Sequence, residues 1–477
     1  MTGMPTTTPH PDHTPSTCAP PRGVDGARQR NGRGDTIVAI STPPGVGGIA
    51  VVRLSGPAAL ELALQHLAVD RLAPRSAVHC HFGEIDDGIA VYYPKGYTGE
   101  PTVEFSCHGS QYVQEAIVQA LVDGGARLAE AGEFTLRAFL NGRINLSQAE
   151  AVADLIDAVT PAQHRLAVSQ LRGGYAQELK ALRQQLLDLT SLLELELDFS
   201  QEDVEFADRT ELHQLLSRLI SHISRLIDSF RMGNALKRGI PTAIIGRPNA
   251  GKSSLLNALL HEERAIVSPV AGTTRDTVEE TFNMGGLTFR LIDTAGLHHT
   301  DDPLENMGIR RTIAAAVQAD VILYVHDATR PWTDAVEDLQ ALRDDAGVDI
   351  EGSKHLWIVV NKIDLPEAVE SNRKLGVAIS ATQGIGLEEL RSTIIKAVSA
   401  DMASSDQVLL TNARHYDALG RTKAALWRVA HGLADGLSAD LVAVDLRDAL
   451  YHLGTITGEV TNDEVLGNIF SRFCIGK

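Results

Sequence analysis

A glycine-bounded segment that ends in a lysine and a serine is the strongest chemical signal in this chain. Residues 246–253 read Gly-Arg-Pro-Asn-Ala-Gly-Lys-Ser, the G-x-x-x-x-G-K-S pattern. Gly246 and Gly251 allow the backbone to curl so that successive N–H groups face an anion. Lys252 is placed to reach the β- and γ-phosphates of a nucleotide, and the hydroxyl of Ser253 to bind Mg²⁺. The pattern predicts a phosphate-binding loop; the alternative is a simple glycine turn before a helix.

Four further segments follow this loop, and their order indicates GTP. Asp364 ends an Asn-Lys-Ile-Asp segment, and its carboxylate can accept two hydrogen bonds from guanine, a pattern that adenine lacks. Thr274 is the expected second hydroxyl ligand of Mg²⁺, Asp293 can hold the ion through water, and Gly296 can offer its N–H to the γ-phosphate. The residues expected to bind GTP are Asn249, Ala250, Gly251, Lys252, Ser253, Ser254, Thr273, Thr274, Asp293, Thr294, Ala295, Gly296, Asn361, Lys362, Asp364, Ser380, Ala381 and Thr382.

The residue after the Asp-Thr-Ala-Gly segment differs from that of many small GTPases. Leu297 stands where those proteins carry a glutamine that orients the attacking water. Leucine cannot do this, so another cation, either an arginine or a metal ion, has to neutralise the charge of the transition state. Arg275 is nearby, but it is better explained as a solvated charge in a loop.

Strands and helices have to position these segments. Short apolar runs at 242–245, 287–292, 356–360 and 376–379 predict strands, and helical spacing follows the phosphate loop. We therefore expect an α/β P-loop GTPase domain, Ras-like and with a mostly parallel sheet, over residues 239–399.

Helical segments flank this domain on both sides. Apolar residues between 212 and 230 recur at helical spacing on one face, which predicts bundle packing. Capping boxes are expected at Ser147–Glu150 and at Thr160–Gln163, the second with a proline at the first turn. An all-α helical-bundle domain over 147–238 and 400–477 would thus contain the nucleotide domain as an insertion, an arrangement suited to passing GTP-driven movement to another site.

The remaining chain divides into an N-terminal domain and a tail. Strands at 49–54 and 102–106 and a helix at 111–123 predict an α/β domain over 35–146. Residues 1–34 are rich in Pro, Thr and Gly and predict a disordered tail without a secretory signal.

Composition sets limits on partners and location. The 477 residues suggest about three domains. The net charge of −18 opposes a protein-wide basic surface for nucleic acid, so RNA would have to be met through a local patch or a partner protein. Four dispersed cysteines and the lack of a long apolar run favour a cytoplasmic protein without a membrane span.

Motifs outside the nucleotide domain carry a more specific resemblance. They are Asp35–Ala39 with Thr42–Gly45, Gly132–Gly142, Leu146–Ala151 and the final Cys474-Ile-Gly-Lys477. With them, the chain from about Asp35 to Lys477 resembles the MnmE (TrmE) family of tRNA-modification GTPases, in the potassium-activated TrmE/Era-like class.

This resemblance implies a GTPase without an arginine finger, which fits Leu297. By resemblance, K⁺ takes the place of the finger's charge, Glu305 helps to position the attacking water through a second water, and Ser268 joins the GTP-binding set. The resemblance also implies that two nucleotide domains of a homodimer meet face to face during hydrolysis. The residues implied to hold K⁺ are Asn249, Ser268, Val270 and Thr273.

The resemblance also implies that the N-terminal domain binds 5-formyl- or 5,10-methylene-tetrahydrofolate. Arg53, Glu104, Arg143 and Lys477 match the family's folate contacts. From the residues alone, Arg53 and Glu104 would be surface charges, and Arg143 replaces a lysine common in the family. Cys474 matches a cysteine of the family's ending, and we hypothesise that it acts as a nucleophile.

The implied reaction is the addition of a carboxymethylaminomethyl or aminomethyl group at C5 of the wobble uridine. It requires MnmG, a partner that uses FAD and NADH, in a heterotetramer through which tRNA is reached. Two alternatives remain: a switch GTPase of the Era-like class in ribosome assembly, and a folate-dependent methyltransferase with a GTPase regulator. Neither the residues 35–146 nor the Cys-Ile-Gly-Lys ending is expected in the first of these.

Overall fold

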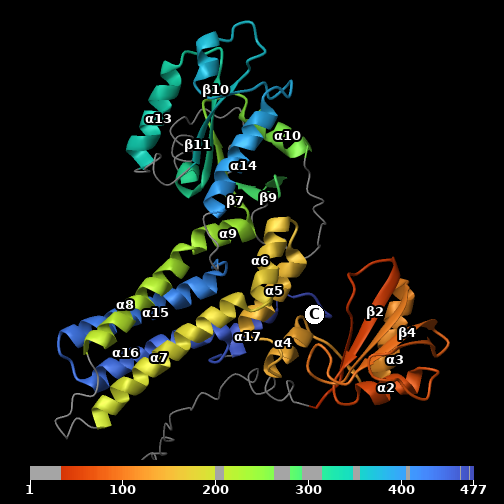
Figure 1. The fold of residues 1–477 in the computed structure, drawn as a ribbon. Helices are drawn as coiled ribbons and strands as arrows, with labels where there is room; N and C mark the ends of the chain where they lie inside the picture. The colour runs from red at the N-terminus through yellow and green to blue at the C-terminus, as the bar shows by residue number, and fades with distance from the viewer. Residues whose placement is uncertain are drawn as a thin grey trace, which may run out of the picture. The chain divides into compact units, whose positions relative to one another are not determined.

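The computed structural model describes residues 34–198, 209–262, 280–292, 314–346, 355–403, 409–461, 463–471 and 473–477. The chain divides into two compact units (Figure 1). The first contains Met1–Arg143 together with Asn468–Lys477, and the second contains Ile144–Gly467. The finer division predicted from the sequence stays a prediction, and of the predicted tail 1–34 only Gly34 is described.

A six-stranded sheet forms the first unit, in the order β3-β4-β5-β2-β1-β6. Neighbouring strands are antiparallel except β1 and β6, which are parallel. The strands and helices predicted in this region are confirmed. The elements are β1 Ile37–Ile40, β2 Gly47–Ser55, α2 Ala59–His66, β3 Ala77–Phe82, β4 Asp86–Tyr93, β5 Thr102–Gly109, α3 Gln111–Asp123, β6 Arg127–Leu128 and α4 Glu133–Leu140.

Helices cover both faces of strand β1. On one face, α2 and α3 pack against alternate residues of β1, β2 and β5, where Val38 belongs to a large apolar cluster. On the other face, Ile37 and Ala39 contact the fully buried ring of Phe134 in α4. Because side chains alternate along a strand, one short strand serves both layers and places α4 against the sheet.

Buried charges fix the start of α4. Glu133 accepts hydrogen bonds from Arg127 and Arg137, and Asp35 accepts from the same two arginines. Burial alone would raise the pKa of Glu133, but Arg127, the Glu130 amide and Arg137 outweigh it and lower that pKa. A network in which each buried charge has a partner holds one geometry, so the first turn of α4 is fixed.

Four long helices make the bundle of the second unit. They are α7 Gly174–Asp198, α8 Arg209–Asp228, α15 Ala413–Ala434 and α16 Ala439–Thr457. Leu216, Leu219 and Ile223 of α8 face its core, which confirms the helical pattern expected at 212–230. Among the described residues, none of the helices combines the length and apolar character that a bilayer span requires.

Two shorter helices precede the bundle, α5 Leu146–Asp157 and α6 Pro161–Leu171. The capping box of Thr160 and Gln163 is confirmed. The one predicted at Ser147 is wrong, because Asn145 caps α5 together with Gln148. The backbone N–H of Gln148 lies 2.8 Å from Oδ1 of Asn145, so the helix begins earlier than the sequence pattern suggested.

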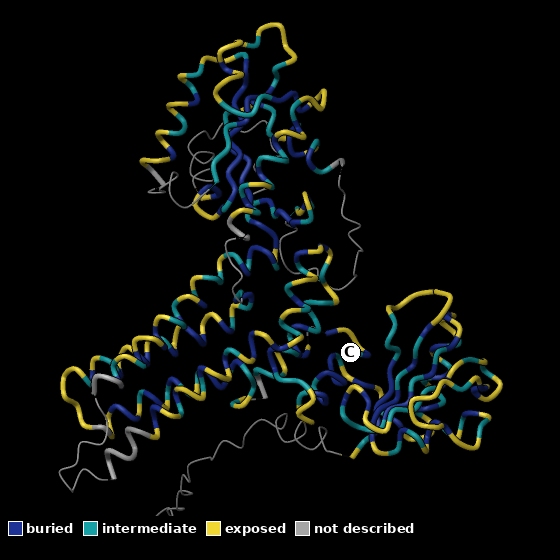
Figure 2. Tube along the Cα trace, in the orientation of Figure 1, coloured by how far each residue is buried: buried dark blue, intermediate teal, exposed yellow. Residues whose placement is uncertain are grey.

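The nucleotide domain is a second six-stranded sheet, in the order β12-β11-β10-β7-β9-β8, parallel except between β8 and β9. Its central strands are buried (Figure 2). Helices α10 and α14 pack on one face and α13 on the other. The elements are β7 Ile240–Ile245, α10 Lys252–Glu262, β8 Thr281–Met284, β9 Leu287–Leu291, β10 Val321–Asp327, α13 Thr333–Ala346, β11 His355–Asn361, η1 Glu370–Lys374, β12 Val377–Ala378 and α14 Leu387–Ala403.

The chain leaves the helical region and returns to it at neighbouring points. It leaves through α9 (Phe230–Arg238) and returns ahead of α15. The N–H of Leu410 donates to Oγ of Ser229 at 3.0 Å, and a Cβ added at Gly233 would lie 2.1 Å from the Leu410 oxygen. The nucleotide domain is therefore an insertion whose two connections lie close together. The remaining described helix is α17 Asp463–Phe470.

Candidate functional site

The phosphate-loop segment connects β7 to α10 and depends on its glycines. Gly246 has φ of +143°, and a Cβ there would lie 2.3 Å from the main-chain oxygen of Val325 in β10. Gly251 has φ of +96°, and its Cβ would lie 2.1 Å from Nδ2 of Asn361. No side chain fits at either position, so the predicted curled backbone is confirmed at both glycines. Asn249 also lies in the left-handed region, with φ of +61°.

Lys252 folds back over the loop that it follows. Its Nζ donates to the main-chain oxygens of Gly246 at 2.8 Å and Arg247 at 3.0 Å. Burial lowers the pKa of Lys252. Because α10 begins at this residue, the positive end of the helix and the lysine cation share one loop. Ser253 is exposed in the first turn and Ser254 is half-buried, while Ala250 is buried.

Asn361 joins the phosphate loop to the loop that follows β12. Its Nδ2 donates to the Ala250 oxygen at 3.0 Å, and its Oδ1 accepts from the Ala381 N–H at 3.0 Å. The side chain is 2% exposed. One buried amide thus fixes two segments that the sequence analysis assigned separately to the phosphates and to the base.

The expected base-binding residues meet at this same edge of the sheet. Lys362, with φ of +66°, places Nζ 2.6 Å from Oδ2 of Asp327 at the end of β10. Asp364 is exposed, so its carboxylate is open to a ligand. Ser380 is buried, and its Oγ lies 3.3 Å from Oγ1 of Thr382.

The sequence analysis missed two charged contacts in this region, that of Lys362 with Asp327 and that of Arg247 with Asp338. Burial would raise the pKa of Asp327, but its bonds to Lys362 and Thr329 outweigh burial and lower it. Arg247 in the phosphate loop contacts carboxylates of α13, with Nε 3.0 Å from both oxygens of Asp338. An acid at the end of the buried strand β10 could have indicated Asp327, whereas nothing local to residue 247 indicates a partner 91 positions away.

Part of the predicted nucleotide site lies outside the described residues. It comprises Ser268, Val270, Thr273, Thr274, Asp293, Thr294, Ala295, Gly296 and Glu305, together with Arg275 and Leu297. The expected second Mg²⁺ ligand, most of the expected K⁺ ligands and the expected water-positioning acid therefore stay predictions.

In the first unit, two of the predicted ligand-binding residues pair with each other. Nε of Arg53 in β2 lies 2.7 Å from Oε1 of Glu104 in β5, and the two residues face each other across the strands. The guanidinium carbon of Arg53 lies 5.8 Å from the ring centre of Tyr97 and 5.5 Å from that of Phe134. Within the described residues, Oε2 of Glu104 has no hydrogen-bond partner. This flat cationic and aromatic surface, with one acceptor to spare, suits a planar heterocycle.

The segment Cys474–Lys477 reaches the same place. The Gly476 oxygen accepts from Nη1 of Arg53 at 3.4 Å and from Oγ of Ser41 at 3.3 Å. The main-chain oxygen of Lys477 accepts from the N–H groups of Phe134 at 3.0 Å and Thr135 at 3.3 Å, in the first turn of α4. Residues more than 400 positions apart in sequence thus meet at Arg53.

For Cys474 and Arg143, the structure shows no side-chain contact with Arg53 or Glu104. Cys474 is exposed, and its main-chain oxygen accepts from the Lys477 N–H at 3.3 Å. Arg143 is exposed and lies over Gly99, since a Cβ added at Gly99 would be 3.1 Å from Cγ of Arg143. The structure therefore joins Arg53, Glu104 and the C-terminal segment by direct contacts, and it does not show Arg143 in contact with them.

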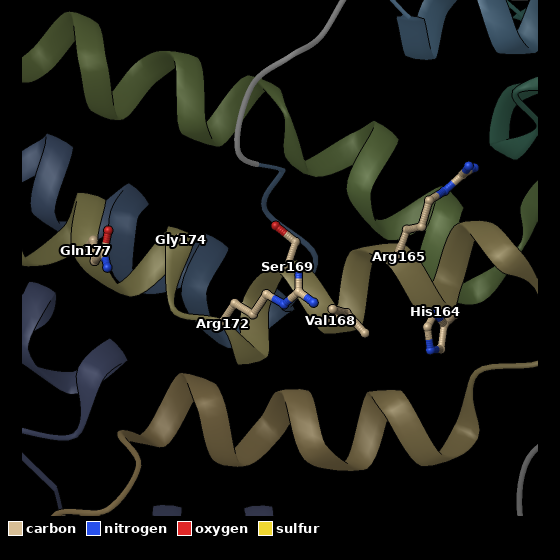
Figure 3. Close-up of a pocket in the computed structure, with 7 residues that line it drawn as sticks. All are labelled: His164, Arg165, Val168, Ser169, Arg172, Gly174 and Gln177. Atoms are coloured by element: carbon tan, nitrogen blue, oxygen red, sulfur yellow. The ribbon is translucent and has the colours of Figure 1, made fainter.

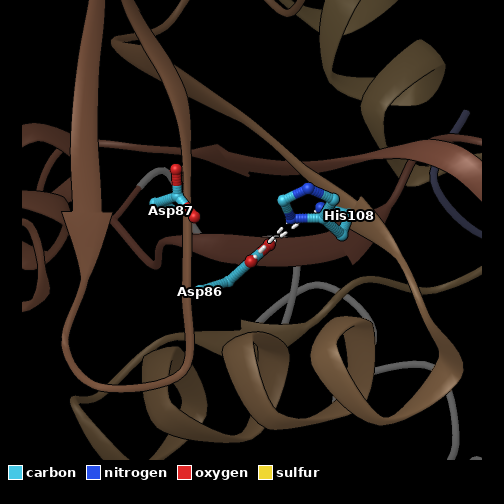
Figure 4. A group of neighbouring side chains, drawn as sticks. All are labelled: Asp86, Asp87 and His108. Carbon is cyan, nitrogen blue, oxygen red and sulfur yellow. Dashed lines mark hydrogen bonds and ion pairs between the residues drawn. The ribbon is translucent and has the colours of Figure 1, made fainter.

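A separate surface group in the first unit contains Asp86, Asp87 and His108 (Figure 4). Their potential ligand atoms lie within 4.8 Å of one another. Nδ1 of His108 is 2.8 Å from Asp86, which raises the pKa of His108, and Asp87 pairs with His79 at 3.1 Å. These hydrogen bonds account for the group, and we assign no metal to it.

A glycine-bounded phosphate loop and an Asn-Lys-x-Asp segment, joined at the edge of a mostly parallel sheet, define a P-loop protein of the guanine-nucleotide-binding class. A family model described as MnmE helical domain matches residues 146–474, and one described as GTP-binding protein TrmE N-terminus matches residues 36–143. The chain belongs to the MnmE family, as the resemblance predicted.

The sequences of curated relatives align with this chain over nearly their full length. The tRNA modification GTPase MnmE of Flavobacterium johnsoniae is 46% identical over 467 residues, covering 93% of this chain and 99% of the relative. The protein of the same name from Christiangramia forsetii is 46% identical over 475 residues, with the same coverage. Among solved structures, the G domain of the T. maritima FeoB iron transporter is 28% identical, covers 33% of this chain and 97% of that chain, and has a TM-score of 0.23.

Proposed function

We propose that this chain is the GTP-hydrolysing subunit of a system that modifies tRNA at the wobble uridine. The proposed product carries a carboxymethylaminomethyl or aminomethyl group at C5. The observation that carries this proposal is the presence, in one chain of the MnmE family, of a guanine-nucleotide site and of a second site where the C-terminal segment meets Arg53. The relatives named above are called tRNA modification GTPases.

In the nucleotide site, the chain's own groups bind and orient GTP. The loop amides and Lys252, which now donates to loop carbonyls, would turn to the β- and γ-phosphates. Asn361 holds the phosphate loop and the base loop in one register, so a bound guanine at Asp364 aligns the phosphates with Lys252. GTP hydrolysis follows from this positioning together with the charge supplied by bound cations.

Two cations complete the proposed nucleotide site. Ser253, exposed beside the curled loop, and Thr274 would hold Mg²⁺, which supplies positive charge at the phosphates when bound. Asn249, with its left-handed backbone, would hold K⁺ together with Ser268, Val270 and Thr273, and Glu305 would position water. We expect GTP turnover by the full chain in KCl and little in NaCl; equal rates in the two salts would contradict the K⁺ site.

The first unit is the proposed site of a tetrahydrofolate that carries one carbon, in the 5-formyl or 5,10-methylene form. Arg53 and Glu104 would bind its heterocycle against the nearby aromatic rings, while Arg143 and Lys477 would bind its carboxylates. Cys474 is proposed as a nucleophile because it is exposed on the segment that contacts Arg53.

We further propose a homodimer that assembles with two copies of MnmG, the FAD-dependent partner, in the cytoplasm. The test is mass spectrometry of the wobble uridine in tRNA from cells that lack this chain. We expect the C5 group to be lost, to return with the wild-type chain, and not to return with Lys252→Ala. Full modification in the cells that lack the chain would overturn the proposal.

A further inference from the structure

Helix α6 and its C-cap residue Arg172 carry a row of polar and cationic side chains on one exposed face. Arg165, Ser169 and Arg172 follow at helical spacing, so they lie along one side, with His164 beside them. With Val168, Gly174 and Gln177 they line a cavity of about 430 Å³ at the corner between α6 and α7 (Figure 3). We call these seven residues the α6–α7 surface.

The two arginines of this surface have no acidic partner among the described residues. Three acidic groups on the neighbouring helices are engaged elsewhere: Glu150 contacts Arg414 and His415, Asp154 contacts Lys237, and Glu178 contacts His222. Asp157 of α5 has no ion pair among the described residues. Arg165 and Arg172 therefore carry their charge without a direct ion pair to a described acidic group.

Exposed arginines elsewhere in the same unit fall into two groups, since Arg218, Arg225 and Arg238 have no acidic partner among the described residues, whereas others are paired. Arg421 pairs with Asp417, and Arg428 pairs with Asp445 and Asp448. Arg165 and Arg172 differ from the other unpaired arginines in that both line the same cavity, in a chain with a net charge of −18. Uncompensated cations of this kind attract anions.

Helix ends add little to this field. Gly174, the first residue of the 25-residue helix α7, lines the cavity, but so do Val168 and Ser169 from the last turn of α6. The positive end of one helix dipole and the negative end of the other therefore oppose each other. Ser169 and Gln177 add neutral hydrogen-bond donors to the same cavity. Cations and neutral donors together form a surface suited to phosphate.

We propose that the α6–α7 surface binds the phosphate backbone of tRNA. Arg165 and Arg172 are seven positions apart, or about 10 Å along the helix. Figure 3 shows that the two guanidinium groups do not converge on one point. That arrangement fits successive phosphates of a polyanion better than one small anion. The inference rests on the proposed function, since it names where this acidic chain meets its RNA.

The test measures binding of the full chain to an unmodified tRNA transcript over a series of KCl concentrations. We expect the double variant Arg165→Gln/Arg172→Gln to bind about tenfold more weakly at moderate salt. We also expect its slope of log affinity against log salt to fall by about two, one for each lost phosphate contact. The control, Arg421→Gln/Arg428→Gln, removes two paired arginines of the same unit and should retain both affinity and slope.

GTP turnover separates a local effect from misfolding. Both double variants should hydrolyse GTP at the wild-type rate, since the α6–α7 surface lies outside the nucleotide site. A double variant at 165 and 172 with wild-type affinity and slope would overturn the inference, as would a wild-type chain that does not bind tRNA even at low salt. The proposed function is judged separately, by the wobble-uridine measurement in cells.

Competitors distinguish the class of partner. We expect inorganic phosphate not to displace tRNA at the same total phosphate concentration, because it cannot span both arginines. Displacement at that concentration would assign the cavity to a small anion. If the variant instead loses binding to a polyglutamate peptide while keeping that to tRNA, the surface belongs to an acidic protein; either result contradicts the proposal.

Discussion

At the scale of single residues, Asn361 shows that a motif residue can act through the protein rather than on the ligand. Its amide connects Ala250 in the phosphate loop to Ala381 in the base loop and is fully enclosed. Removing one partner of a buried hydrogen bond leaves the others unsatisfied, which costs about 1–3 kcal/mol. Nucleotide affinity should therefore depend on Asn361 even if it never touches GTP.

We expect Asn361→Ala to lose both stability and nucleotide affinity. The matched control is Asn372→Ala, because Asn372 is equally buried and its Nδ2 donates to Ala328 and Arg330 in the same domain. Both variants should lower the free energy of unfolding by about 1–3 kcal/mol. Titration with a fluorescent GTP analogue should show weaker binding for Asn361→Ala alone; equal losses in both variants would mean that Asn361 acts only through stability.

Sequence reasoning succeeded where the local backbone geometry determines the residue type. Gly246 and Gly251 could be predicted because positive φ and close backbone approach leave glycine as the choice. It could not supply contacts across long separations. Arg53 and Glu104 were expected as two separate ligand contacts, whereas strand pairing makes each the other's partner. Register between strands decides such pairs, and single-residue patterns carry no record of it.

At the scale of elements, the C-terminal segment behaves as an added layer on the first unit. Gly476 has φ of +94°, and a Cβ there would lie 2.1 Å from the Ile40 oxygen at the end of β1. Docking of this segment places the main-chain oxygen of Lys477 on the N–H groups of Phe134 and Thr135. The close approach at Gly476 therefore controls whether the first turn of α4 is covered.

We expect Gly476→Ala to release the C-terminal segment. The control is Gly125→Ala, where φ is +111° but no atom lies within 4 Å of the added Cβ. The control should cost about 1–2 kcal/mol from backbone strain alone. Hydrogen exchange should accelerate at the Phe134 and Thr135 amides in Gly476→Ala and remain slow in Gly125→Ala. Unchanged exchange in both would show that these amides are protected without the segment.

Packing between α5 and α15 depends on a buried ion pair that the sequence pattern misassigned. Glu150 was expected in a capping box, but it lies 3.0 Å from Nε of Arg414 and contacts His415. Asn145 is the cap instead, which a pattern search misses because Ser147 and Glu150 also match the box. The tertiary partner decided the role of Glu150, and that partner lies 264 positions away.

Low pH should weaken the contact of Glu150 with Arg414 and His415. Burial would raise the pKa of Glu150, but His415 and Arg414 outweigh it and lower that pKa from 4.5 to about 2. The unfolded chain therefore takes up the proton first, so the stabilisation is complete above pH 4.5 and is lost as the pH falls towards 2. Glu150→Gln should lower the free energy of unfolding at pH 7 by about 3–5 kcal/mol.

Urea unfolding at several pH values measures this effect. The wild-type chain should lose stability between pH 4.5 and 2 more steeply than Glu150→Gln. Glu388→Gln is a suitable control, since Glu388 is exposed and its contact with Arg391 is 3.8 Å. Parallel pH curves for the wild type and Glu150→Gln would show that this carboxylate is not the group that titrates.

At the scale of the whole molecule, the chain path makes the nucleotide domain separable from the bundle. The bundle core uses residues of α7, α8, α15 and α16 and none between 239 and 408. Leu410 lies against Ser229 and Gly233 in the helix through which the chain leaves. An insertion joined at neighbouring points can pass movement to its host without being needed for the host's fold.

We therefore expect the bundle to fold after residues 239–408 are replaced by about eight Gly and Ser residues. Arg238 lies nine positions beyond Ser229, about 13 Å along α9, and such a linker spans about 16 Å. The deletion also removes Trp332 and Trp357, which leaves Trp427 of α15 as the single tryptophan. Its fluorescence and the helical circular dichroism should change together in one cooperative thermal transition.

The apolar surface that the deletion uncovers is the main threat to the solubility of the shortened chain. Ala235 and Leu236 of α9 pack against the nucleotide domain and would become exposed. A second variant with Leu236→Lys should therefore remain soluble and show the same transition. Helical circular dichroism without a cooperative Trp427 transition in both variants would mean that the bundle needs the inserted domain to reach its native packing.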